Sequence, residues 1–247
     1  EVNKTGLSNY YCLISALAYY VSFQYSKSFI LIKKIKTNTI ISNLVSLFLE
    51  RNFNQLNEEI EKIILDVTYT DEFISNNYIQ NNEDGEHKIY EITIAKSLNG
   101  FIKYFQTGNE FYLTSAKTNL NCLKEIAEVN SEPSIWWVVR LLLLIAEGFN
   151  EASLWNSLKK HFDTETTIIK KYIQSLVYLH PRGIHELFIT QRKSLTKVLN
   201  EEGNGCVVTI PTSSGKTRIA EIAILDCINK NAENKILYIA PYRSLAF

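Results

Sequence analysis

The sequence predicts a mainly α-helical protein, in which a long helical part is followed by the start of an α/β part. Apolar residues recur on the 3.6-residue period of an α-helix through roughly the first 165 residues of the chain. No stretch of that part alternates with the period of two that is typical of a half-buried strand. The 247 residues include only 9 Gly and 4 Pro, which argues against an all-β sandwich and favours long helices.

Composition excludes several classes of protein. An apolar fraction of 46% with 21% charged residues is ordinary for a globular protein and excludes disorder as the main state. The 26 basic and 26 acidic residues cancel, so the chain as a whole lacks a basic footprint for nucleic acid. The four cysteines are far apart without a C-x-x-C pair, which favours reduced thiols and a cytoplasmic location over a disulfide framework or a zinc site.

The uncharged span 5–26 raises the question of a membrane helix. It contains Asn9, Gln24 and several tyrosines, and is therefore too polar for a hydrocarbon span of about 20 residues. We expect a buried core helix here and no membrane contact.

Apolar stripes define the predicted helices in chain order. The first carries Leu13, Leu17 and Val21 at positions i, i+4 and i+8. The second places Leu56, Ile60, Ile63 and Ile64 in a Glu/Lys-rich segment, as in an amphipathic helix that lies at the surface. Further stripes occupy residues 89–105 and 111–127, and three more helices are predicted at 136–146, 152–162 and 166–179. Trp136 and Trp137 are expected to be core residues.

Two segments of the helical part resemble each other in pattern. Residues 15–29 and 97–116 each place aromatic residues at the end of one helix, followed by a short polar turn and a second helix. Tetratricopeptide units are built in this manner, but their consensus is not met and no exact period repeats. Both an irregular helical bundle and an array of helical-hairpin repeats therefore remain open.

A domain boundary is predicted near residues 180–183, where His-Pro-Arg-Gly interrupts the helical pattern. The predicted domains are 1–180, an all-helical accessory domain, and 181–247, the start of an α/β domain. Nine basic and six acidic residues lie in 181–247, so that 1–180 holds 17 basic and 20 acidic residues. The mildly acidic helical domain is poorly suited to grip phosphates on its own.

The segment 206–229 has the strand, loop and helix order of a phosphate-binding loop. An apolar, β-branched run at 206–210 is suited to a buried strand, the loop Pro-Thr-Ser-Ser-Gly-Lys-Thr follows at 211–217, and a helix is predicted at 218–229. Backbone N–H groups of such a loop surround phosphates, and here they come from Thr212, Ser213, Ser214 and Gly215. Ile210 stands where the general motif has its first glycine.

The last residues of this loop carry the reactive groups. Gly215 allows close approach of the backbone to a phosphate, Lys216 reaches the β- and γ-phosphates, and the Thr217 hydroxyl is a ligand for Mg²⁺. The sequence therefore predicts ATP and Mg²⁺ as cofactors, with Lys216 and Thr217 as catalytic residues.

The loop and its neighbours resemble superfamily-two DEAD/DEAH-box (DExH) helicases. The run 211–217 resembles their motif I. Upstream, Phe188 and Gln191 resemble the Q-motif region, which implies that the aromatic stacks on adenine and the amide hydrogen-bonds it. Downstream, a second predicted buried strand at 236–240 leads into Pro-Tyr-Arg-Ser-Leu, which resembles motif Ia and implies that Arg243 contacts a nucleic-acid backbone.

The resemblance implies a RecA-like motor domain in a parent enzyme that couples ATP hydrolysis to movement along DNA or RNA, with DNA favoured. The long helical extension resembles that of the Hachiman-type anti-phage defence helicase subunit, which implies a nuclease-type effector as a partner for the helical domain. The family's Walker B acids are expected beyond Phe247, so we expect this span alone to be inactive as an ATPase.

Other interpretations stay open at this point. The chain could belong to a P-loop ATPase that acts as a signalling switch, or to a helical interaction scaffold with a vestigial nucleotide site. Gln191 could face solvent, Phe188 could be an ordinary core residue and Arg243 an ordinary surface charge. His180 and His185 lack companions at metal-ligand spacing, so a metal site there is not expected.

Overall fold

The computed structural model describes residues 2–36, 39–79, 83–179, 183–200, 206–211 and 215–239. Within these ranges the chain forms twelve α-helices and one 3₁₀ turn. The helices are α1 (Val2–Val21), α2 (Tyr25–Ile32), α3 (Ile40–Leu49), α4 (Phe53–Leu65), α5 (Asp71–Ile79), α6 (Glu83–Thr107), α7 (Glu110–Val129), α8 (Pro133–Ala152), α9 (Leu154–Lys159), α10 (Thr167–Val177), α11 (Ile189–Asn200) and α12 (Lys216–Lys230), with η1 (Val67–Tyr69) before α5. The mainly α-helical fold is therefore confirmed.

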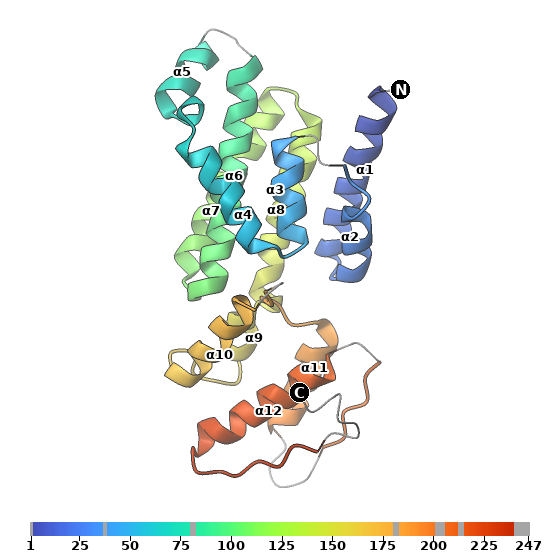
Figure 1. Ribbon diagram of the computed structural model, residues 1–247, viewed down its shortest axis with the longest axis vertical. Helices are drawn as coiled ribbons and strands as arrows, with labels where there is room; N and C mark the ends of the chain where they lie inside the picture. Colours follow the sequence, from blue (N-terminus) through green and yellow to red (C-terminus); the bar gives the residue numbers. More distant parts are fainter. Residues whose placement is uncertain are drawn as a thin grey trace.

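Helices α1–α8 form a bundle at one end of the molecule, which we call the helical bundle (Figure 1). Helix α6 packs on α3, α4 and α7, and α8 packs on α7 and α1. Buried aromatic rings fill the centre. The Phe48 ring lies 5.7 Å from that of Phe101, which in turn lies 5.4 Å from that of Phe149, and all three residues have no exposed surface. Burial of such large apolar side chains is the main source of stability in a bundle of this kind.

Both predicted helical hairpins are present. Helix α1 turns into α2 through Phe23, and α6 turns into α7 through Gly108, each with a positive φ. Asn109 then caps the N-terminus of α7, because its side-chain oxygen accepts a hydrogen bond of 2.9 Å from the Phe111 N–H. The helices range from 6 residues in α9 to 25 in α6, which is typical of an irregular bundle rather than of equal repeats.

The apolar stripes predict most buried positions correctly. Leu13 and Leu17 of α1 are buried, as are Leu56, Ile60 and Ile63 of α4. Three expectations are wrong: Ile64 is 53% exposed, Trp137 is 50% exposed, and Phe111, the first residue of the predicted stripe 111–127, is 69% exposed. Ile64 and Trp137 each directly follow a residue that the helix directs inward or partly inward, and the 100° step between neighbours rotates them toward solvent.

The two predicted strands are not formed in the described residues. Residues 206–210 and 236–239 have no assigned secondary structure, and Val207 and Leu237 are 93% and 83% exposed. In the described part of the chain, the one β-type pairing is the isolated antiparallel bridge between Ser153 and Glu186. A strand needs neighbouring backbone to accept and donate its hydrogen bonds, which local β-propensity alone does not supply.

Helices α9–α12 lie together at the opposite end of the molecule (Figure 1). Helix α12 packs on α11 and α10, and α10 also contacts α6 of the helical bundle. His180, Pro181 and Arg182 lie outside the described residues, and the division of the chain at residue 180 stays a prediction. Among the described helices, none has both the length and the apolar character that crossing a membrane requires.

Candidate functional site

The site is built around the N-terminus of α12, which begins directly after Gly215. Gly215 has φ 78° and ψ 41°, a left-handed conformation, and no side chain of the described residues caps the helix. The N–H groups of the first turn, together with the positive end of the helix dipole, therefore form an arrangement that attracts anions. Lys216 and Thr217 follow in that first turn, and both are exposed. The Lys216 ammonium and the Thr217 hydroxyl thus lie beside N–H groups that can bind an anion.

Gln191 of α11 lies against Gly215. Its Nε2 donates a hydrogen bond of 3.2 Å to the Gly215 carbonyl oxygen, and its Oε1 accepts one of 2.8 Å from the Phe188 N–H. The residue is only 5% exposed, so the interpretation of Gln191 as a solvent-facing glutamine is wrong. A Cβ added to Gly215 would collide with this same Nε2. The structure therefore brings together two residues that the sequence places in separate motifs.

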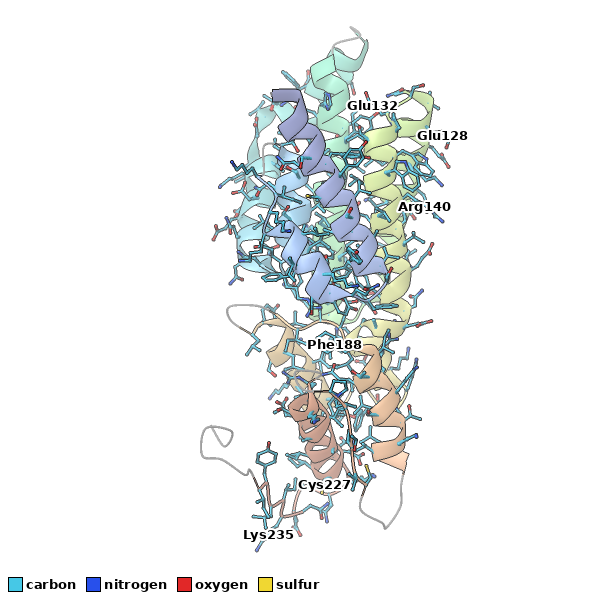
Figure 2. The ribbon with its side chains drawn as sticks, turned by 90° about the vertical axis from the view of Figure 1, so that its right-hand side faces the viewer. Glu128, Glu132, Arg140, Phe188, Cys227 and Lys235 are labelled. Atoms are coloured by element: carbon cyan, nitrogen blue, oxygen red, sulfur yellow. The ribbon has the colours of Figure 1, made fainter. Side chains whose placement is uncertain are left out.

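Phe188 lies at the junction between the helical bundle and the helices α10–α12 (Figure 2). Its half-buried ring lies 5.7 Å from the ring of Tyr25 in α2. Sequence reasoning identified Phe188 but missed Tyr25, because 163 residues separate the two in the sequence and no local pattern connects them. Phe188 is half-buried, so part of its surface remains accessible.

The remaining predicted site residues cannot be placed. Thr212, Ser213, Ser214 and Arg243 lie outside the described residues, as does the predicted motif that contains Arg243. Their roles stay predictions.

A buried polar cluster stands directly before the Phe188–Gln191 segment, and we call it the Glu186 network. It consists of Tyr20, Tyr25, Arg51, His185 and Glu186. The Glu186 carboxylate accepts hydrogen bonds from the Tyr20 hydroxyl and, at 3.0 Å, from the Tyr25 hydroxyl. His185 Nε2 lies 3.2 Å from Glu186 Oε2, and Arg51 Nη2 lies 3.9 Å from it.

Charge is compensated inside this network. Burial by itself raises the pKa of Glu186. The hydrogen bond and the charge of His185, the Arg51 charge and the hydrogen bond from Tyr20 outweigh burial and hold that pKa below its ordinary value. Burial lowers the pKa of His185 and raises the pKa values of Tyr20 and Tyr25. At neutral pH the network therefore consists of an ionised Glu186, a neutral His185 and two protonated tyrosines, with Arg51 as the cation.

Acid should destabilise the protein through this network. Because the folded-state pKa of His185 lies below its unfolded value near 6.5, the unfolded state binds the extra proton first, and the free energy of unfolding falls as the pH drops below that value. Glu186 adds a second loss below its unfolded value near 4.5. A tenfold difference in proton affinity between the folded and unfolded states corresponds to about 1.4 kcal/mol of stability.

A His185→Phe variant tests the first of these losses. Phenylalanine suits the site, since the His185 ring lies 4.2 Å from Phe105 and 5.1 Å from Phe53. Urea denaturation of the intact protein at pH 7.0 and pH 5.5 should show a loss of stability in the wild type and a smaller one in the variant. Equal acid sensitivity in both proteins would contradict the prediction.

Further contacts fix α11 and α12 in place. Arg192 of α11 lies over the Phe23 ring at 5.1 Å and pairs with Glu151 of α8 at 3.4 Å. In α12, Glu221 pairs with Arg218 and accepts a hydrogen bond of 3.2 Å from the Tyr172 hydroxyl of α10. Burial raises the pKa of Tyr172 to about 12, so this hydroxyl stays protonated and donates. Helix α12, which begins directly after Gly215, is therefore held against α10.

Comparisons with known proteins agree with this geometry. Residues 189–247 match the family of DEAD/DEAH box helicases. The chain is 37% identical over 237 residues to Hachiman protein HamB of Bacillus cereus, which covers 96% of this chain and 20% of that protein. It is also 46% identical over 68 residues to the ATP-dependent DNA helicase Hel308 of Pyrococcus abyssi, which covers 28% of this chain and 9% of that helicase.

These similarities differ in extent. The chain spans about a fifth of the length of HamB and under a tenth of that of Hel308. The resemblance to DExH helicases is confirmed for the residues that include Gln191 and Gly215–Thr217. Similarity to HamB also extends through the helical bundle, whereas the match to Hel308 is too short to do so.

Proposed function

We propose that this chain, which resembles DEAD/DEAH box helicases in residues 189–247 and HamB over nearly its whole length, is the N-terminal part of an ATP-dependent nucleic-acid helicase or translocase. The observation that carries the proposal is the start of α12, where Gly215 contacts Gln191 and the exposed Lys216 and Thr217 follow. DNA is favoured as the track, because one relative is named as a DNA helicase.

The residues present fit a nucleoside triphosphate with Mg²⁺. Uncapped N–H groups at the start of α12 and the Lys216 ammonium suit phosphate oxygens, and the Thr217 hydroxyl suits a divalent cation. When bound, the metal neutralises charge on the phosphates. Phe188 offers a ring surface to the base. Beyond its bonds to Gly215 and Phe188, the Gln191 amide retains one N–H donor and one oxygen lone pair for the base. Thr212, Ser213 and Ser214 are proposed to complete the phosphate loop, and Arg243 to contact the nucleic-acid backbone.

We extend the proposal to the domain division and to the biological setting. Residues 1–180 would be the accessory domain and 181–247 the start of the RecA-like domain, in which the exposed runs at 206–210 and 236–239 become paired strands. Similarity to a Hachiman protein supports a role in anti-phage defence, with a nuclease-type effector as the partner of the helical domain. A cytoplasmic location is consistent with such a role.

ATP turnover by the intact parent protein tests the proposed function. Turnover should increase with single-stranded DNA, and a Lys216→Ala variant should lose on the order of 100-fold or more, because the ammonium stabilises charge that develops on the transferring phosphate. Lys197→Ala, an exposed lysine in α11, is the matched control and should turn over ATP like the wild type.

The other outcomes separate the rival functions. Stimulation by RNA alone would make RNA the track. Turnover that requires Lys216 but ignores both nucleic acids would indicate a signalling switch, and a wild type without turnover would indicate a scaffold with a vestigial site.

A further inference from the structure

Glu186 connects the helical bundle to the segment that carries Phe188 and Gln191. Its side chain is 2% exposed, yet its partners come from distant parts of the sequence. The hydrogen-bond donors Tyr20 and Tyr25 lie at the end of α1 and the start of α2, whereas the ion-pair partner Arg51 lies between α3 and α4. A buried carboxylate is stable only when such donors and a countercharge surround it, so the position of Glu186 depends on α1, α2 and the α3–α4 connection of the helical bundle.

The backbone on both sides of Glu186 is fixed as well. The His185 carbonyl oxygen accepts a hydrogen bond of 2.9 Å from the Leu154 N–H, and the Leu187 N–H donates one of 2.8 Å to the Ala152 carbonyl oxygen. The segment is thus held against the α8–α9 junction. The residues directly before Phe188 are therefore held both by their backbone and by the Glu186 side chain.

Those next residues lead directly to the start of α12. The Phe188 N–H donates to Gln191 Oε1, and Gln191 Nε2 donates to the Gly215 carbonyl oxygen. A continuous path of hydrogen bonds and two peptide links therefore runs from Tyr25 through Glu186 and Phe188 to Gly215.

Tyr25 contacts this path at two points. Its hydroxyl donates a hydrogen bond of 3.0 Å to Glu186 Oε1, while its ring lies 5.7 Å from the Phe188 ring at an angle of 36°. The Arg51 guanidinium lies over the same Tyr25 ring at 5.0 Å, which orients the tyrosine further. One side chain of the helical bundle thus contacts both the carboxylate and the Phe188 ring.

We propose that Glu186 and Tyr25 are positioning residues for the base of the bound nucleotide, so that the helical bundle helps to set the preference for adenine over guanine. The inference rests on the proposed function, because it assigns the base to Phe188 and Gln191. Neither positioning residue touches the nucleotide itself. They act by holding the Phe188 ring and the Gln191 amide where a purine can be read.

Two substitutions disturb the path while they preserve side-chain size. Glu186→Gln places an NH₂ donor against tyrosine hydroxyls that donate to the carboxylate, and it removes the negative partner of Arg51. Tyr25→Phe keeps the ring beside Phe188 but deletes one hydrogen bond, and is the milder change. Tyr69→Phe is the matched control, since it deletes a tyrosine–carboxylate hydrogen bond of 2.5 Å to Glu91 elsewhere in the helical bundle.

The experiment measures KM and kcat of the intact protein for ATP and for GTP, with thermal unfolding of each variant recorded in parallel. In Glu186→Gln we expect KM for ATP to rise roughly tenfold at nearly unchanged kcat, because displacement of the Phe188 ring and the Gln191 amide weakens contacts with the base by about 1.4 kcal/mol. KM for GTP should change less, so the preference for ATP shrinks. Tyr25→Phe should show a smaller shift in the same direction, and Tyr69→Phe none.

The results that overturn the proposal are distinct from those that overturn the proposed function. If both variants unfold at lower temperature but keep the wild-type ratio of KM for GTP to KM for ATP, the network serves stability alone and the inference fails. If the wild-type protein neither binds nor hydrolyses ATP, the proposed function fails and this inference with it.

Discussion

Replacing Gly215 by alanine should reduce ATP binding by the intact protein by roughly 30- to 1000-fold, as two unfavourable effects of about 1–2 kcal/mol each would give. The first effect is conformational, because φ is 78° at this position and a Cβ disfavours the left-handed region. The second is steric, since the added Cβ would collide with Gln191 Nε2 and lie 3.1 Å from Gln191 Cδ. Calorimetric titration with ATP measures the effect.

Gly148→Ala provides the matched control. Gly148 lies within α8, and its added Cβ would meet Phe23 ring atoms at 3.6 Å, an ordinary contact. Alanine inside a helix is more favourable than glycine by about 0.5–1 kcal/mol, so this variant should be slightly more stable and bind ATP normally. Normal ATP binding by Gly215→Ala would show that neither the backbone conformation nor the contact with Gln191 matters.

A double mutant separates the two effects. Gln191→Ala removes the atoms with which the new Cβ collides, but leaves the backbone conformation of Gly215 unfavourable for alanine. If the collision dominates, Gly215→Ala combined with Gln191→Ala should bind ATP as well as Gln191→Ala alone. Strictly additive losses would instead assign the whole effect of Gly215→Ala to the left-handed backbone.

The helices could be predicted from sequence because their signals are local. The 3.6-residue stripe of α4 identified Leu56, Ile60 and Ile63 as buried without knowledge of any partner. The predicted strand at 206–210 depended on local β-propensity as well, but a strand exists only through pairing with distant backbone. Within the described part of the chain, residues 206–210 do not form a strand, and Val207 is exposed.

The candidate site likewise contains residues that local sequence patterns predict and residues that they do not. Gln191 and Gly215 could be identified because motifs with fixed spacing mark them, although their direct hydrogen bond could not be foreseen. The Glu186 network could not be predicted, since its members extend from Tyr20 to Glu186 and none stands in a recognisable pattern with another. Only packing of the helical bundle against the segment after residue 182 brings them together.

Replacing Phe105 by alanine should lower the free energy of unfolding by about 3–5 kcal/mol, the usual cost of removing a buried phenylalanine ring. Phe105 of α6 is 1% exposed, and its ring lies 4.8 Å from Phe149 and 4.2 Å from His185. Its carbonyl oxygen accepts a hydrogen bond of 2.7 Å from the Trp155 indole, which the substitution leaves intact. The loss therefore reports the ring alone. Phe111→Ala, at a position that is 69% exposed, should cost less than about 0.5 kcal/mol.

Hydrogen exchange in the intact protein locates the loss as well as measuring it. Since the Phe105 ring packs on His185, next to Glu186, the substitution should reduce the protection of amides in α6 and of the Leu187 and Arg192 amides together. Such coupled loss would mean that the helical bundle and the Gln191 segment open as one cooperative unit. Reduced protection confined to α6 would instead mean that the segment is held independently of the helical bundle, in which case the Glu186 network cannot transmit the position of the helical bundle to Gln191.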